Sequence, residues 1–356
     1  MSKGINNKVN FLKFAFSILI VVRHFLGQYS GVYEGEIFEL WSKHGSDFGL
    51  FGVTFFFIVS GYFMTAAAMK APDTNCAEQA IGYVLGKYKK QFRVYFAALL
   101  FAFIFYCITT PAENRTAMYS VLVELFALQC SGLPCELLNA PTWYISAMLI
   151  AMLPLYFLNT RYKKTYLNVI APLGALLILG YSYRMSSGNL ADGGIYYRLG
   201  RAFWGLMLGS VCYLASDKLK NVKRLIATII EAAMWVLICW YLFCEKRLFN
   251  YSSNAVVIVA LTIALSFTFS KQSYTHVIFD KAEKICTLLG KWSVYIYFNH
   301  WTVLTIVYRY SVPHHPVPAV EFMKLIALTA LLSVIEFLIF RLIDKLKANK
   351  QIKQAV

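Results

Sequence analysis

Charged residues are scarce in this sequence: they make up 15% of its 356 residues, while hydrophobic residues make up 59%. An ordinary soluble domain has about 25% charged residues, so the composition excludes that class. The high apolar content also excludes a disordered chain. Acidic residues are the scarcer sign, with 18 Asp and Glu against 34 Lys and Arg. The composition therefore predicts a polytopic membrane protein.

The net charge of +16 does not indicate a nucleic-acid partner, because the basic residues lie in short segments between apolar runs. If the N-terminus is cytoplasmic, 24 of the 34 basic residues fall in inner segments and nine in outer ones. Such a bias in short loops sets orientation by the positive-inside rule. We therefore predict cytoplasmic N- and C-termini. Contact with anionic lipid or a phosphate-bearing substrate is a second interpretation of the same charge.

Runs of about 17–23 mostly apolar residues recur along the chain, the length needed to cross ~30 Å of hydrocarbon. They predict an all-α fold with ten membrane helices, at 9–27, 48–69, 93–110, 142–158, 165–183, 196–215, 224–244, 253–270, 286–308 and 320–342. The segment 118–129 is too short to span and contains Glu124, so we expect it to be interfacial or re-entrant. The prediction is one membrane domain, 1–356, without a soluble domain, in a bacterial inner or plasma membrane.

The eight cysteines lack the spacing of a metal site, so no metal is predicted. Cys130 and Cys135 are close enough for a small disulfide, although free thiols are the preferred interpretation. At the N-terminus, Lys3 and Lys8 precede an apolar run that no small-residue cleavage site follows. We interpret this segment as an uncleaved signal anchor.

Two ionisable residues share one face of the first predicted helix. Lys13 and His24 are eleven positions apart, which is three helical turns plus about 20° and a rise of about 16 Å. Ionisable groups inside a membrane span are costly and are usually functional. His24 is the candidate general base, with a structural interhelical hydrogen bond as the alternative. Lys13 is either a phosphate contact or a lysine that snorkels to the membrane boundary.

A second basic cluster lies in KYKKQFRVYF, at the start of the third predicted helix. Lys90 and Arg93 are spaced i, i+3 and face the same way. With Lys87, Lys89 and Lys13 they predict a cationic mouth that suits phosphate groups. Ordinary positive-inside charge is the alternative interpretation of this run.

Further candidates lie near the outer ends or the middle of predicted helices. Trp143 and Tyr144 could stack on a sugar ring, but an aromatic belt predicts the same residues. Arg198 and Arg201 run against the positive-inside expectation, and we predict that they bind an anionic or glycan acceptor. His300 lies mid-span and is a candidate for assisting catalysis or binding the acceptor, with an interhelical hydrogen bond as the preferred interpretation.

Two other polar positions are predicted to be structural. Ser60 and Gly61 are interpreted as close-packing residues between helices, because Ser60 lacks the context of a nucleophile elbow. Glu336, deep in the final span, needs a partner, for which Lys13 and Arg341 are the candidates.

Several of these segments together resemble the membrane acyltransferase-3 family. The similar segments, in order, are Lys13-x10-His24 (the family's Arg-x10-His), Phe55–Met64 (FF-x-x-SG), Lys90-x-x-Arg93 (Arg-x-x-Arg), Thr142–Leu149 (Trp-Tyr-x-Ser), Tyr197–Gly209 (R…F-x-x-G) and Leu289–Trp301 (G-x-x-S-x-x-x-Y-x-x-H). The chain departs from the family where lysine replaces arginine at 13 and 90 and where Phe96 replaces a proline. After Glu336, the family's usual basic residue and proline are absent.

The resemblance implies an O-acyltransferase that moves an acyl group, acetyl above all, from cytoplasmic acyl-CoA to a hydroxyl of an extracytoplasmic glycan or lipid-linked glycan. The CoA phosphates would lie on Lys13, Lys90 and Arg93, and His24 would be the base, with a covalent acyl-histidine as a less favoured variant. Acyl-CoA is a co-substrate, and no tightly bound cofactor is implied. A transporter or flippase of a glycan precursor is the alternative, although the chain shows no inverted repeat.

Overall fold

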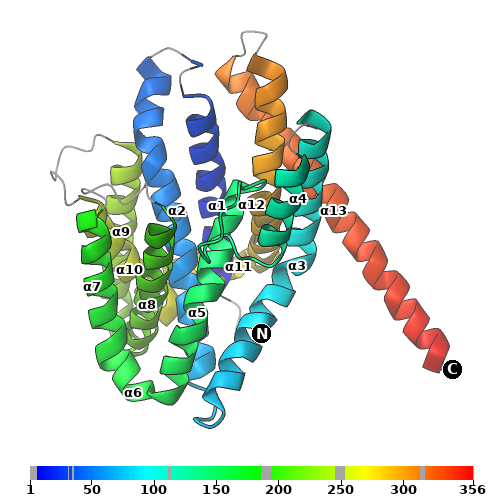
Figure 1. Ribbon diagram of the computed structural model, residues 1–356. Helices are drawn as coiled ribbons and strands as arrows, with labels where there is room; N and C mark the ends of the chain where they lie inside the picture. The colour runs from blue at the N-terminus through cyan, green and yellow to red at the C-terminus, as the bar shows by residue number, and fades with distance from the viewer. Residues whose placement is uncertain are drawn as a thin grey trace.

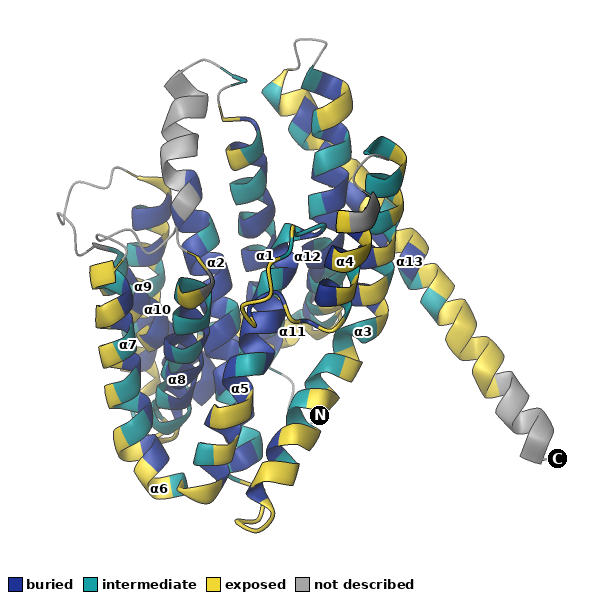
Figure 2. Cartoon of the chain, viewed as in Figure 1, coloured by how far each residue is buried: buried dark blue, intermediate teal, exposed yellow. Residues whose placement is uncertain are grey.

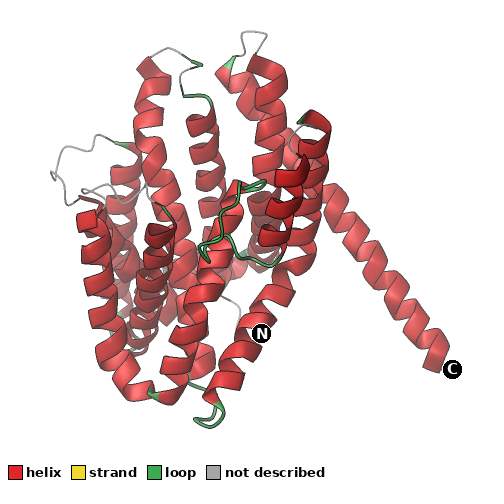
Figure 3. Ribbon diagram, viewed as in Figure 1, coloured by secondary structure: helices red, strands yellow, loops and turns green. Residues whose placement is uncertain are grey.

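The computed structural model describes residues 6–30, 32–33, 36–110, 114–185, 194–244, 253–312 and 317–355. Figure 1 shows helices standing side by side in a bundle, with the C-terminal part of the last helix projecting away from it. Within the described ranges there are helices, loops and one isolated bridge between Ser30 and Tyr33, but no strand. The predicted all-α class is therefore confirmed (Figure 3).

The helices are labelled in chain order. Their bounds are α1 (Asn7–Gln28), α2 (Glu36–Ala68), α3 (Cys76–Thr109), α4 (Asn114–Leu125), the 3-10 turn η2 (Ala140–Thr142), α5 (Trp143–Arg161), α6 (Lys163–Thr165), the π turn η3 (Tyr166–Ile170), α7 (Ala171–Met185), α8 (Ile195–Leu219), α9 (Arg224–Phe243), α10 (Ser253–Ser270), α11 (Thr275–Lys281), α12 (Glu283–Ser311) and α13 (Pro318–Ala355).

Each of the ten predicted spans falls on one helix or one run of consecutive helices. Among the described residues, seven helices are long and apolar enough to cross a membrane, and α10 with α11 forms a pair bent by 61° that would be an eighth span. The chain is thus a multi-pass membrane protein. α8 and α12 are long enough to cross a membrane but are too polar to be counted among these helices. The count of ten and the orientation of the termini stay predictions.

The bundle separates an apolar outer surface from a packed interior. Figure 2 shows exposed residues along α3, α7 and α13, whereas most of the membrane-length parts of α2 and α5 are buried. Many of the exposed residues are large and apolar, such as Leu177 on α7 and Leu331 on α13. So much exposed apolar surface is stable only against hydrocarbon or a partner. The polar helices α8 and α12 instead bury their polar side chains, including Arg201 and His300, inside the bundle.

Close backbone contact between α2 and α8 depends on two glycines. A Cβ at Gly61 would lie 2.1 Å from the carbonyl oxygen of Leu206, and one at Gly209 would lie 2.2 Å from that of Ile58. No other residue fits at such distances, because the contacting atoms are backbone. Gly61 therefore has the close-packing role that the sequence predicts for it.

Buried polar contacts fix the first turn of α1 to α9, α10 and α11. The Lys8 ammonium forms an ion pair with Glu231 at 2.7 Å and donates to Thr275 Oγ1 at 2.8 Å. Lys8 and Glu231 are both buried. These contacts hold α1 in place along its axis, which in turn sets the depth of Lys13 and His24.

The loop between α4 and α5 is organised by a buried carboxylate. Glu124 accepts hydrogen bonds from the backbone N–H of Leu138 at 2.5 Å and from Thr142 Oγ1 at 2.9 Å. Its side chain is fully buried. α4 is a short apolar helix, as the sequence predicts. Since Thr142 directly precedes α5, Glu124 helps to set where that helix begins.

Candidate active site

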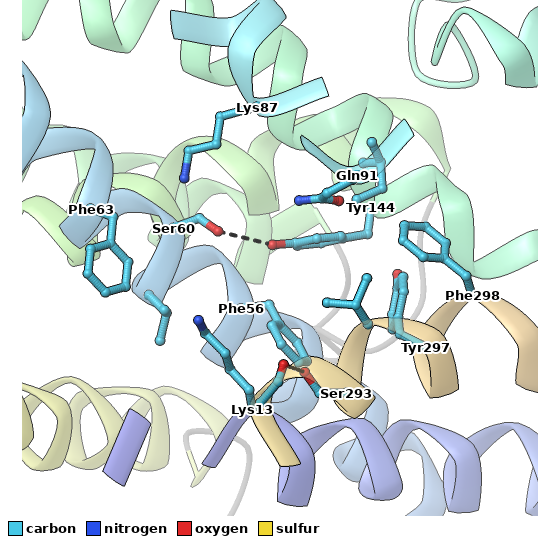
Figure 4. A pocket seen from close by; sticks show the side chains of 14 residues that line it. Lys13, Phe56, Ser60, Phe63, Lys87, Gln91, Tyr144, Ser293, Tyr297 and Phe298 are labelled. Carbon is cyan, nitrogen blue, oxygen red and sulfur yellow. Dashed lines mark hydrogen bonds between the residues drawn. The ribbon is translucent and has the colours of Figure 1, made fainter. Parts of the chain in front are cut away.

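A cavity of about 180 Å³ lies inside the bundle, between α1, α2, α3, α5 and α12. Figure 4 shows the side chains that surround it. They are Lys13, Phe56, Val59, Ser60, Phe63, Lys87, Gln91, Tyr144, Ile145, Gly290, Ser293, Val294, Tyr297 and Phe298. Five helices, from α1 at the start of the chain to α12 near its end, thus contribute to one cavity.

Two lysines supply positive charge to this cavity from different helices. The ammonium groups of Lys13 and Lys87 point into it from opposite sides (Figure 4). Lys13 Nζ lies 5.7 Å from the ring centre of Phe63, and Lys87 Nζ lies 5.5 Å from that of Tyr83. Among the described residues, neither ammonium has a carboxylate or a hydrogen-bond acceptor within reach. Two cations that face one cavity, with no acidic partner among the described residues, favour an anionic ligand, because it would relieve their mutual repulsion.

Polar groups of the cavity wall lie between the two lysines. Ser60 Oγ and Tyr144 Oη are 3.3 Å apart and form a hydrogen bond across the space between α2 and α5 (Figure 4). Ser60 was predicted to be a packing residue with Gly61, but it faces the cavity instead. Tyr297 Oη is already engaged, because it donates to the carbonyl oxygen of Pro141 at 2.5 Å.

Three aromatic rings in the cavity lining contact one another. The ring centres of Phe56, Tyr144 and Tyr297 are 5.9 to 6.2 Å from one another. The Tyr297 ring centre is also 6.1 Å from that of His300, which does not itself line the cavity. Tyr297 is therefore the cavity residue that lies next to the histidine pair described below.

His24 and His300 form a hydrogen-bonded pair across α1 and α12. His24 Nδ1 is 2.8 Å from His300 Nε2, and the two ring planes differ by only 9°. On its other side, His300 Nδ1 is 3.0 Å from the carbonyl oxygen of Ile296. His300 is fully buried, whereas His24 is partly exposed. An interhelical hydrogen bond was one interpretation of both His24 and His300, and the structure contains it.

Only one of the three residues predicted to bind the CoA phosphates lines the cavity. Lys90 is exposed on α3, and Arg93 is exposed and paired with Asp344 of α13 at 2.7 Å. The residues that α3 contributes to the cavity are Lys87 and Gln91, which are spaced i, i+4. From Gln91, Arg93 is a further 200° around the helix, so it points away from the cavity.

The predicted outer acceptor residues form a separate group. The guanidinium carbons of Arg198 and Arg201 lie 5.5 and 5.9 Å from the ring centre of Trp143. Arg201 is buried and donates to the carbonyl oxygens of Gly49 at 3.0 Å and Leu50 at 2.5 Å. Arg201 thus ties α8 to α2, and Trp143 is next to it. Tyr144, although adjacent in sequence, belongs to the cavity and not to this group.

The predicted partners of Glu336 are wrong. Its carboxylate accepts from Asn299 Nδ2 at 2.8 Å, and no ion pair joins it to Lys13 or Arg341 in the described part of the chain. Neighbouring turns of α12 and α13 satisfy the group locally, so a cation is not required. All eight cysteines are free, Cys130 and Cys135 included. The described residues contain no cluster of His, Cys, Asp and Glu that could hold a metal ion.

The fold and this interior define a multi-pass membrane protein with a buried, positively charged cavity next to a histidine pair. A family model described as an acyltransferase domain matches residues 6–338, which contain every site residue named above. The chain therefore belongs to the membrane acyltransferase-3 family and is a membrane acyltransferase. No curated protein and no solved structure matches it.

Proposed function

We propose that this protein transfers an acyl group, acetyl above all, from acyl-CoA to a hydroxyl group of an extracytoplasmic glycan or lipid-linked glycan. The observation that carries the proposal is that Lys13 and Lys87, which have no acidic partner among the described residues, face one cavity of a chain in this family. CoA is the donor because it presents phosphate groups to the cations and a thioester to the acceptor hydroxyl.

The donor enters from the cytoplasmic side with phosphate oxygens against Lys13 and Lys87. Ammonium groups bind phosphate as point charges with three donors each. The cavity of about 180 Å³ is smaller than the ~300 Å³ lower bound of common ligand sites, so side chains move when the donor binds. Tyr297 is the side chain that moves to let the thioester reach His24, since it lines the cavity and its ring lies next to that of His300.

His24 is the general base of the transfer. It takes the proton of the acceptor hydroxyl while the acceptor oxygen forms a bond to the thioester carbonyl carbon. The carbon–sulfur bond then breaks, and the CoA sulfur leaves with the proton that His24 returns to it. Acyl ester and free CoA are the products, and His24 is neutral again. This order needs no covalent intermediate on the enzyme.

The acceptor lies on the side of Trp143 and Arg198. Sugar rings stack on exposed indole faces, and Trp143 is partly exposed. Arg198 is also partly exposed and offers donors to glycan hydroxyls or to an anionic group. Arg201, whose guanidinium already binds two carbonyl oxygens of α2, acts here by holding Trp143 in position.

The test is transfer of labelled acetyl from acetyl-CoA into the lipid and glycan fractions of membrane vesicles that contain the protein. His24→Ala should lower the rate by about 100-fold or more, the usual contribution of a general base. His276→Gln is the matched control, because this buried histidine of α11 lines no part of the cavity with Lys13. The control should transfer acetyl normally. Absence of transfer by the wild-type protein, from acetyl-CoA and from longer acyl-CoA, would overturn the proposal.

A further inference from the structure

The hydrogen bonds around His300 determine which nitrogen of His24 can act as a base. A carbonyl oxygen can only accept, so His300 Nδ1, 3.0 Å from the Ile296 oxygen, must be the protonated nitrogen. In a neutral imidazole with Nδ1–H, Nε2 has the free lone pair and accepts. His24 Nδ1 lies 2.8 Å from that Nε2, so His24 Nδ1 must carry a proton and donate.

His24 Nε2 is consequently the nitrogen with a lone pair. It has no hydrogen-bond partner among the described residues, so it is open to an incoming hydroxyl. We propose that His300 is a positioning residue, which holds His24 in the tautomer with a basic Nε2. The tautomer follows from the geometry alone, and its catalytic use rests on the proposed function.

The backbone of α12 holds the His300 ring in this orientation. Ile296 and His300 are spaced i, i+4, so the carbonyl that His300 binds lies on the preceding turn of the same helix. Carbonyl oxygens have two lone pairs, so Ile296 can accept from the side chain as well as from the helix backbone. No described carboxylate bonds to His300. The orienting group is therefore a peptide dipole and not the carboxylate of a serine-protease triad.

Packing holds both rings in this arrangement. His300 is fully buried, and its ring plane lies within 9° of the His24 plane. Trp301 meets His24 edge-on, with ring centres 5.2 Å apart and planes at 81°. When His24 takes the acceptor proton on Nε2, Nδ1–H continues to donate to His300, so the pair does not rearrange. His300 itself gains and loses no proton in the reaction.

Two near-isosteric variants separate positioning from structural support. His300→Leu removes the acceptor for His24 Nδ1–H, whereas the side-chain amide oxygen of His300→Gln can replace it. In the vesicle assay, His300→Leu should lower the maximal rate by about 100-fold, with the KM for acetyl-CoA unchanged. His300→Gln should restore the rate to within about 10-fold of wild type. Equal rates for His300→Leu and wild type, or equal loss in both variants, would overturn the positioning role.

The tautomer is measured directly by ¹⁵N NMR of histidine-labelled protein in nanodiscs, with the His24 signal assigned from His24→Gln. Wild-type His24 should show a protonated Nδ1 and an unprotonated Nε2. A protonated Nε2 at neutral pH would refute the inference, whether or not the variants fold. If wild-type vesicles transfer no acetyl group, the proposed function fails but the tautomer assignment is still decided by the spectrum.

Discussion

Replacement of Lys13 by Met should weaken CoA binding without weakening the fold. Met is close to Lys in length and removes only the charge. A hydrogen bond to a charged group contributes about 1.5–3 kcal/mol. Each 1.4 kcal/mol is about tenfold in affinity. Since Lys13 has no partner in the described residues, its whole contribution goes to the ligand, and Lys13→Met should raise the Kd of CoA by about 10- to 100-fold.

The measurement is calorimetric titration of CoA into purified protein in nanodiscs, which requires no acceptor. Lys87→Met should cause a loss of similar size, because Lys87 faces the same cavity. Lys90→Met is the matched control on α3. Lys90 is exposed and does not line the cavity, so its removal should change the Kd by less than about threefold.

Thermal unfolding of the same variants completes the test. Lys13→Met should unfold at about the same temperature as wild type, because Lys13 has no carboxylate or hydrogen-bond partner among the described residues and the variant loses only a contact with the Phe63 ring. If Lys13→Met binds CoA as tightly as wild type, the cavity is not the donor site. If Lys90→Met weakens CoA binding more than Lys13→Met does, the phosphates bind on the exposed face of α3, as the sequence pattern suggests.

Two predictions concern the fold itself. Gly61→Ala should lower the stability by about 1–3 kcal/mol or more, because its Cβ would lie 2.1 Å from the Leu206 oxygen. Gly82→Ala is the control and should be neutral or stabilising, because a Cβ there has nothing within 4 Å. A Gly61→Ala variant that melts at the same temperature as Gly82→Ala would contradict this prediction. Lys8→Met alone should cost about 3–5 kcal/mol by leaving Glu231 buried without its partner, whereas the double variant with Glu231→Leu should recover most of that stability. Denaturant unfolding measures both, and no recovery in the double variant would show that the ion pair is not what Lys8 contributes.

Two long helices, α8 and α12, are too polar to be recognised as membrane spans from hydropathy, and both bury candidate functional residues. α8 holds Arg201, and α12 holds His300 and Tyr297, each buried by surrounding helices. A polar side chain is tolerated at membrane depth when protein and not lipid surrounds it. Helices whose hydropathy is too low for a lipid-exposed span therefore indicate where the interior of this membrane enzyme lies.

The sequence by itself determined the helices. The thickness of the bilayer fixes the length of an apolar run, so all ten runs predicted as spans coincide with helices in the structure. It also determined that Lys13 and His24 lie on one face of the first helix, because eleven residues make three helical turns plus about 20°. The motifs along the chain indicated the acyltransferase-3 family, which the match over residues 6–338 shows.

Only the tertiary structure decided which of these residues meet. The rotation of α3 about its axis brings Lys87 to the cavity and turns Arg93 toward Asp344, and a run of basic residues does not reveal that rotation. His24 and His300 are 276 positions apart, and the packing of α1 against α12 makes them a pair. Hydrogen bonds between helices depend on the relative depth and rotation of both, and neither is a property of one segment alone.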